Sequence, residues 1–114
     1  MTIAAFRKHC LGLPGATYDV KWGKDHCYSV GGKMFAVFGP GNFSFKVDDN
    51  RFLELTDRKG IIPAPYMAKH KWVLLESAKA LPADDVKALL TRSHELVAAK
   101  LSKKLRDTLK ITPL

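Results

Sequence analysis

The sequence has few of the residues that hold small folds together covalently or through metals. It contains two cysteines among 114 residues, so a disulfide framework cannot form, and both thiols are expected to be free in a reducing compartment. Each cysteine follows a histidine, as His9-Cys10 and His26-Cys27, but adjacent side chains diverge on a helix or strand and do not easily converge on one zinc ion. We therefore expect no metal and no cofactor.

Sequence motifs of catalysis are absent as well. There is no Gly-rich phosphate loop, no Gly-x-Ser-x-Gly elbow and no His-Glu-x-x-His motif. A nucleophilic pair of Cys10 or Cys27 with His94 is sterically conceivable, because the partners in such pairs are usually far apart in sequence. Only the residue types support that pair, and His94-Glu95 within a helix is more simply a solvent-exposed or capped pair. We expect a protein that is not an enzyme.

Long apolar runs are also missing. No segment approaches the roughly 20 apolar residues of a membrane span. Arg7 and Lys8 interrupt the N-terminal region before any apolar run of the length found in signal peptides. These absences predict a cytoplasmic protein with no membrane partner.

Positive charge, by contrast, is abundant. The formal net charge is +8, which favours polyanionic partners. The charge is uneven, because residues 1–60 carry nine Lys and Arg against six Asp and Glu, whereas residues 61–114 carry ten against five. The second half is therefore the richer place to look for a polyanion site.

Hydrophobic periodicity predicts a helix, four strands, a helix, a strand and a helix, in that order. The predicted elements are a helix capped by Thr2 and broken by Gly12 to Gly15, strands at 18–21, 26–30, 33–38 and 42–47, a short helix between 48 and 60, a strand at 72–75, and a helix of about 20 residues from Pro82 to Leu101. Phe43, Phe45 and Val47 alternate with polar residues, so one face of that strand is expected in the core. The pattern describes a single α+β domain, 1–114: a two-layer sandwich with helices on one face of a largely antiparallel sheet of about five strands.

The Pro-rich loop at residues 61–72 combines prolines, aromatic rings and cations. Pro63 and Pro65 limit the conformational entropy that the loop loses on ordering, so its other side chains can be held in place. Those side chains are Tyr66, Lys69, His70, Lys71 and Trp72. The combination suits nucleic acid, whose phosphates attract lysine and whose unpaired bases stack on aromatic rings. Trp72 on its own is more simply a core residue at the start of a strand.

Other cations extend this set. Lys46 lies on the polar face of its predicted strand and Lys33 lies beside the Gly31-Gly32 hairpin turn, so both are expected on an open sheet surface. The C-terminal segment adds cations that could equally complement the dipole of the preceding helix. The candidate nucleic-acid-binding residues are Lys33, Lys46, Tyr66, Lys69, His70, Lys71, Trp72, Lys100, Lys103, Lys104 and Arg106.

Six short motifs in a fixed order resemble the MmcQ/YjbR family of small bacterial proteins. They are Leu13-Pro14-Gly15-Ala16, Trp22-Gly23, Gly31-Gly32-Lys33-Met34-Phe35-Ala36, Gly60-Ile61-Ile62-Pro63, Lys69-His70-Lys71-Trp72, and Ser93-His94-Glu95-Leu96-Val97 followed by Lys103-Lys104-Leu105-Arg106. The resemblance implies a fold similar to the bacterial frataxin homologue, with a "double-wing" DNA-binding sheet. It also places Lys33, Lys46, Lys69 and Trp72 on positions where the family usually has Lys and Trp.

The sequence departs from the family pattern in the Pro-rich loop. Ala64-Pro65 stands where glycine is common before the tyrosine, and Ala68 replaces a frequent asparagine whose amide could hydrogen-bond to a base edge. Base-specific contacts are therefore not expected from this loop. An iron role like that of frataxin would need carboxylates on the first helix, which carries Arg7, Lys8 and His9 instead.

Together these features predict a non-enzymatic DNA-binding protein that contacts mainly the phosphate backbone, with low sequence specificity. In the alternative hypothesis, the Pro-rich loop, Tyr66 and Trp72 line a pocket for a small anionic or aromatic ligand, or for a protein partner. The first hypothesis requires that cations far apart in the chain gather on one surface.

Overall fold

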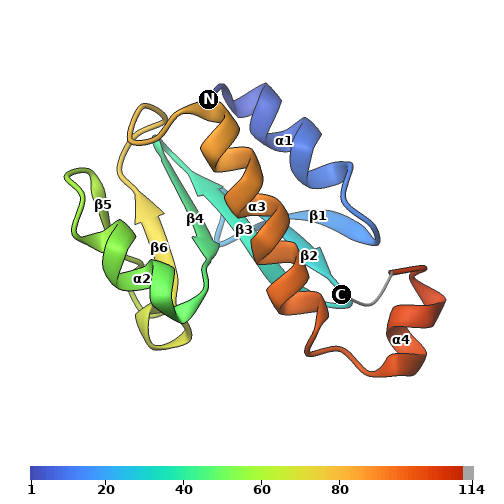
Figure 1. The fold of residues 1–114 in the computed structure, drawn as a ribbon. Helices are drawn as coiled ribbons and strands as arrows, with labels where there is room; N and C mark the ends of the chain where they lie inside the picture. The colour runs from blue at the N-terminus through green and yellow to red at the C-terminus, as the bar shows by residue number, and fades with distance from the viewer. Residues whose placement is uncertain (112–114) are drawn as a thin grey trace.

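The computed structural model describes residues 1–111, and its centre is one antiparallel sheet of six strands (Figure 1). The strand order is β1-β2-β3-β4-β6-β5, which makes β1 and β5 the two edges. The strands are β1 (Ala16–Lys21), β2 (Asp25–Val30), β3 (Lys33–Gly39), β4 (Asn42–Lys46), β5 (Ile61–Pro63) and β6 (Trp72–Leu75). The last three residues of the predicted domain 1–114 lie outside the described residues.

The α-helices cover one face of this sheet, which confirms the predicted α+β sandwich (Figure 1). The helical segments are α1 (Ile3–Leu11), α2 (Asp49–Thr56), the short 3-10 helix η1 (Ala68–His70), α3 (Ala83–Ala98) and α4 (Lys103–Thr108). α3 contacts β3 and β4, α1 packs beside α3, and α2 packs against β5 and β6. We call the opposite side of the sheet the open face. None of the helices described between residues 1 and 111 has the length and apolar character that a bilayer crossing requires.

Local signals located most elements, and the structure differs from the prediction in two details. Thr2 caps α1 as predicted, because its Oγ1 accepts a hydrogen bond from the Ala5 N–H at 3.1 Å. The sheet has six strands where about five were predicted, since β5 lies inside the Pro-rich loop. α3 has 16 residues and ends at Ala98, short of the predicted end at Leu101. Ser102 then caps the separate helix α4 by accepting from the Leu105 N–H at 3.2 Å.

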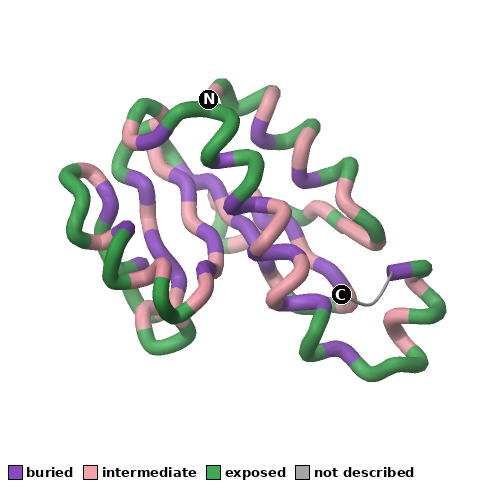
Figure 2. The backbone as a smooth tube through the Cα atoms, in the orientation of Figure 1, coloured by how far each residue is buried: buried purple, intermediate pink, exposed green. Residues whose placement is uncertain are grey.

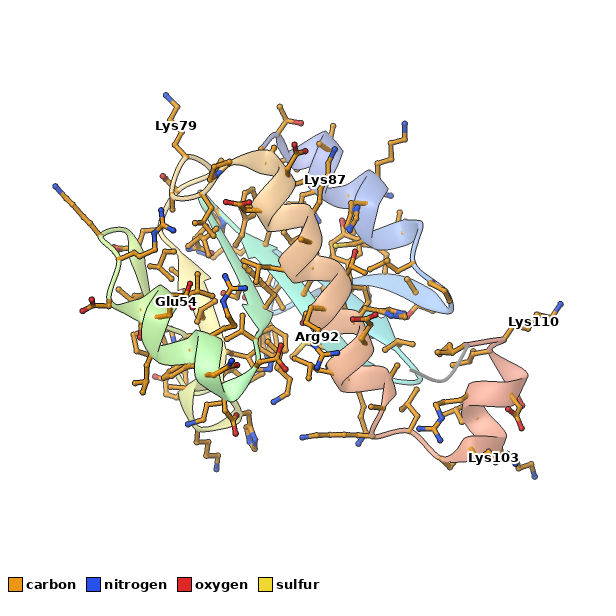
Figure 3. All side chains as sticks on the ribbon, viewed as in Figure 1. Glu54, Lys79, Lys87, Arg92, Lys103 and Lys110 are labelled. Atoms are coloured by element: carbon orange, nitrogen blue, oxygen red, sulfur yellow. The ribbon has the colours of Figure 1, made fainter. Side chains whose placement is uncertain are left out.

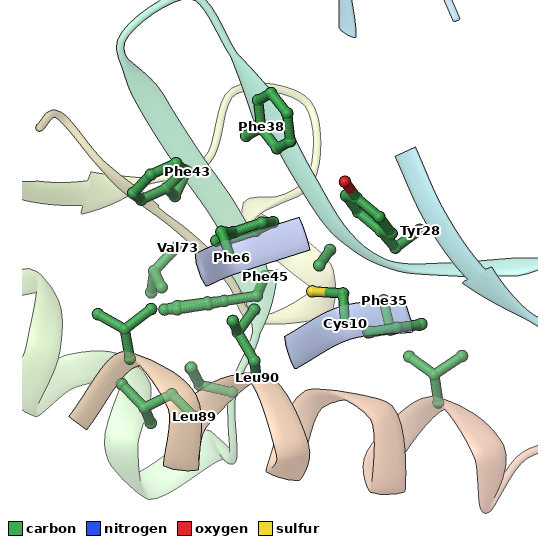
Figure 4. Packing of buried hydrophobic residues seen from close by; sticks show 14 of the residues in the cluster. Phe6, Cys10, Tyr28, Phe35, Phe38, Phe43, Phe45, Val73, Leu89 and Leu90 are labelled. Atoms are coloured by element: carbon green, nitrogen blue, oxygen red, sulfur yellow. The ribbon is translucent and has the colours of Figure 1, made fainter. Parts of the chain in front are cut away.

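Aromatic rings form the centre of the core between α1, α3 and the sheet (Figure 4). Phe6 of α1 is fully buried, stacks on Phe43 with 4.6 Å between ring centroids and meets Phe38 edge-on at 5.5 Å. Phe43, Phe45 and Val47 are all buried, which confirms the predicted inner face of β4. Figure 2 shows the buried residues running along the central strands and along α3. This packing leaves the open face as the side of the sheet that the α-helices do not cover.

Candidate functional site

The segments that carry several predicted binding residues begin or end at one end of the sheet, the lower end in Figure 1, which we call the cationic end. It comprises Lys33, Lys46, Lys69, His70, Lys71 and Lys100. In an antiparallel sheet, the last residues of one strand lie beside the first residues of its neighbours. Lys46 ends β4 opposite Trp72, the first residue of β6, and Lys33 begins β3. η1 directly precedes β6, so the topology brings its cations to the same end.

Lys46 is the central residue of this group. It is half-buried, and its ammonium donates a hydrogen bond to the His70 carbonyl oxygen, so it is less exposed than the predicted open sheet surface implied. Burial lowers the pKa of Lys46, and the positive charges of Lys100 and then Lys71 lower it further, while Asp49 partly offsets them. Lys71 from the loop and Lys100 from the segment after α3 are thus close enough to Lys46 to repel its positive charge.

The other predicted cations differ in their solvent exposure and in their contacts. Lys33, Lys69, His70, Lys100, Lys103 and Lys104 are exposed. Lys71 is half-buried, adopts a left-handed backbone at φ 63° and places its ammonium 5.1 Å from the centre of the Phe52 ring. Arg106 is half-buried and donates to the Ala99 carbonyl at 3.1 Å, which ties α4 to the end of α3. The exposed lysines are the ones available to a ligand.

Positive charge is not confined to the cationic end. Lys103 of α4 and Lys110 after it project outward, whereas Lys79 and Lys87 lie at the far end of the molecule (Figure 3). The structure therefore gathers part of the predicted set around Lys46 and leaves other cations dispersed.

Asp48, which directly precedes α2, is neutralised by Arg92 of α3. The Arg92 Nε and Nη2 donate to the two carboxylate oxygens at 2.9 Å each, a bidentate geometry that links the two helices. This hydrogen bonding holds the pKa of Asp48 below its usual 3.8, although burial acts in the opposite direction. Asp48 consequently subtracts little from the positive potential of the neighbouring cationic end.

Asp48→Asn is expected to lower the free energy of unfolding at neutral pH by about 0.5–1 kcal/mol. The value is modest because solvent screens the pair, whose side chains are 41% and 32% exposed. Since the pKa of Asp48 is lower in the folded than in the unfolded protein, the stabilisation is complete above 3.8 and is lost as pH falls through the lowered pKa. Urea denaturation at neutral pH and well below pH 3 measures this, and an equal difference at both would contradict it.

The Pro-rich loop borders the open face and covers Trp72. The Ala64 N–H donates to the Trp72 carbonyl at 3.0 Å, and the Trp72 N–H donates to the Met67 carbonyl at 3.4 Å. Trp72 is 4% exposed, so it is a buried anchor beneath the loop, whereas Tyr66 is 99% exposed. The two aromatic residues predicted together therefore have different surroundings.

The open face carries a pocket of about 420 Å³, a size within the range of small-molecule sites. Its lining includes Val37, Ser44 and Leu74 from three adjacent strands, and Tyr66 and Trp72 as the alternative hypothesis proposed.

Trp22, in the turn between β1 and β2, also lines this pocket and was not among the predicted binding residues. Trp22 and Tyr66 have φ values of 54° and 64°, a left-handed conformation that costs about 1–2 kcal/mol for a non-glycine residue. In the sequence, Trp22 stood out only as part of the Trp22-Gly23 motif of the family resemblance.

His9, His26 and the two cysteines lie in structural surroundings. His9 bonds to Thr91 Oγ1 at 2.8 Å and His26 bonds to the Tyr18 hydroxyl. Cys10 is fully buried between α1 and the sheet, where burial raises its pKa to about 12, so its nucleophilic thiolate is scarce at neutral pH. Cys27 lies on the other side of the sheet, since Tyr28 next to it faces the core.

His94 corrects one expectation from the sequence. It is 4% exposed, and its Nε2 bonds to the Pro14 carbonyl oxygen at 2.7 Å, so it is buried and not solvent-exposed. Its position in α3 ties the helix to the chain before β1. Among residues 1–111, no three His, Cys, Asp or Glu side chains are grouped closely enough to hold a metal ion.

Comparison with known proteins identifies the family. The crystal structure of protein DR2400 from Deinococcus radiodurans, which has a DUF419 domain, matches with a TM-score of 0.88 and 27% identity, covering 99% of this chain and 91% of that one. A Pseudomonas syringae protein shares the fold, with a TM-score of 0.68 and 19% identity over 85% of this chain and 99% of that one. No match was found among curated proteins. A family model described as YjbR matches residues 11–96, most of the chain, and the chain therefore belongs to the YjbR family.

Proposed function

We propose that this YjbR-family protein is a cytoplasmic, non-enzymatic DNA-binding protein that grips the phosphate backbone with its cationic end. The observation that carries the proposal is the gathering of Lys71 and Lys100 around the half-buried Lys46, whose pKa is lowered first by burial and then by these two positive charges. A phosphate placed among these ammonium groups would relieve the repulsion, so an anion should bind there more favourably than at an isolated lysine.

The free lysines around this centre support contact with a polyanion. Lys33, Lys69 and Lys100 are exposed, and every ion pair within residues 1–111 uses an arginine, so these lysines are not engaged with carboxylates. Double-stranded DNA presents a charge about every 1.7 Å along its axis, which several separate lysines can meet at once. Contacts of this kind position a protein on DNA without reading bases, in agreement with the expected low specificity.

Lys69→Gln combined with Lys100→Gln is expected to weaken binding to a labelled duplex about tenfold near physiological salt. It should also reduce the slope of log affinity against log salt by about 1.8, which is 0.9 for each lost phosphate contact. Both side chains are exposed, so folding should be unaffected. Fluorescence anisotropy at several salt concentrations, with duplexes of different sequence, measures both quantities.

Lys79→Gln combined with Lys87→Gln provides the matched control, because it removes the same charge from exposed residues at the far end of the molecule (Figure 3). This control should change affinity less than about twofold, since screening limits the reach of charge to roughly 8–10 Å. Equal losses in both variants would mean that net charge alone drives binding. Absence of duplex binding even in dilute buffer would reject the proposal.

A further inference from the structure

The pocket on the open face has a definite construction. Its floor is a row of register partners, Val37, Ser44 and Leu74, from β3, β4 and β6. Met67 of the Pro-rich loop lines one side, and Trp22 from the turn between β1 and β2 lines another. The floor and sides are thus mostly apolar, with few polar groups, as in sites for small organic ligands.

Two aromatic rings of this pocket are not explained by folding. Trp22 is 68% exposed and Tyr66 is 99% exposed, so neither contributes much to the core. Both have a positive φ, which an asparagine or glycine would adopt at lower cost. Strained, exposed aromatic residues of this kind are typical of binding surfaces, where the ring stacks on a ligand.

The polar groups of the pocket gather at the end away from the cationic end. Gly39, the last residue of β3, lies beside the side-chain oxygens of Asp25 and Asn42, because a Cβ built on Gly39 would be 2.9 Å from Asp25 Oδ1 and 3.2 Å from Asn42 Oδ1. Glycine therefore makes room for two oxygens at this place.

The only formal charge among these polar groups is negative. Asp25 is the only lining residue that carries charge at neutral pH, and none of the ion pairs described within residues 1–111 involves it. Lys21 is its cross-strand partner but does not line the pocket. A carboxylate beside aromatic rings attracts a ligand that donates hydrogen bonds or carries positive charge, and repels an anion.

We infer that the pocket binds a flat aromatic ring bearing an amino group or a positive charge, which stacks on Trp22 or Tyr66 and donates to Asp25. This site is separate from the proposed contact with DNA and does not depend on it. The inferred ligand is not an anion, whereas the alternative hypothesis from the sequence allowed a small anionic ligand in the same pocket.

Two probes with the same ring and opposite charge test the inference: tryptamine and indole-3-acetate. In an NMR titration of the isotope-labelled protein, tryptamine should shift the amide signals of Val37, Ser44 and Leu74 and bind at least fivefold more tightly than indole-3-acetate at this site. Asp25→Asn should remove most of that preference. Trp22→Asn and Tyr66→Asn should each weaken tryptamine binding severalfold without lowering the melting temperature, because both side chains are exposed.

Three outcomes would overturn the inference: no shift at the pocket with tryptamine, a preference for indole-3-acetate there, or unchanged binding in the Asp25→Asn variant. The Lys69→Gln, Lys100→Gln variant should bind tryptamine as the unmodified protein does. Loss of duplex binding with intact tryptamine binding would therefore separate the two proposals, and so would the reverse result.

Discussion

Replacing Gly31 with alanine is expected to lower the free energy of unfolding by about 3 kcal/mol. Gly31 has φ 58°, where an alanine costs about 1–2 kcal/mol. An added Cβ would also lie 2.7 and 2.8 Å from the two methyl carbons of Leu101, which is 6% exposed and cannot move aside without disturbing its neighbours. Overpacking of this kind adds about 1–3 kcal/mol.

The neighbouring glycine separates the two causes. Gly32 has φ 82°, but a Cβ built there would have no atom within 4 Å, so Gly32→Ala should cost only about 1–2 kcal/mol of backbone strain. Urea denaturation of both variants measures the difference. Equal losses would show that Leu101 yields at little cost and that the close approach is unimportant.

The close approach matters because it positions the basic C-terminal segment. Leu101 and Leu105 both lie near Gly31, so the hairpin between β2 and β3 is the surface on which the chain after α3 is seated. Lys100 precedes Leu101 and belongs to the cationic end. A Gly31→Ala variant that remains folded should therefore also bind duplex DNA more weakly than Gly32→Ala at the same salt concentration.

Parts of the fold with strong local signals could be predicted from the sequence. The Thr2 cap, the alternation in β4 and the strand order along the chain each follow from residues close together in sequence. The end of α3 could not be predicted in that way. Ala98, Ala99 and Lys100 are good helix formers, so the helix ends there because Leu101 packs at the hairpin, which is a contact distant in sequence.

The residues of the candidate sites also divide into those that local patterns predict and those that only long-range contacts position. The alternating pattern of β4 predicted that Lys46 points away from the core, but only the folded chain places the His70 carbonyl beside its ammonium. Trp22 lies in a turn where no periodicity applies, and its partners in the pocket come from strands distant in sequence. Residues whose roles depend on such long-range contacts are the ones that sequence patterns do not identify.

Ser93 is the clearest such residue, and Ser93→Ala is expected to cost about 2–4 kcal/mol of unfolding free energy. Ser93 is fully buried in α3, donates to the Phe35 carbonyl at 2.6 Å and accepts from the Lys46 N–H at 3.0 Å. The register of β2 and β3 shifts between Tyr28 and Ser29, which leaves Phe35 without a cross-strand partner in that pair of strands. One hydroxyl therefore satisfies the irregular part of β3 and the end of β4 together.

Removing this hydroxyl leaves two buried backbone groups unpaired, each costing about 1–3 kcal/mol, which is why the expected loss exceeds that of an ordinary hydrogen bond. Ser102→Ala is the matched control, since it removes an exposed cap of α4 and should cost about 1 kcal/mol. Urea denaturation of the two variants measures both losses.

Because the Lys46 backbone is held by Ser93, duplex binding should weaken in Ser93→Ala even under conditions where it remains folded. A loss no larger than that of Ser102→Ala would mean that the strands close the gap without the helix, and that α3 does not set the position of Lys46.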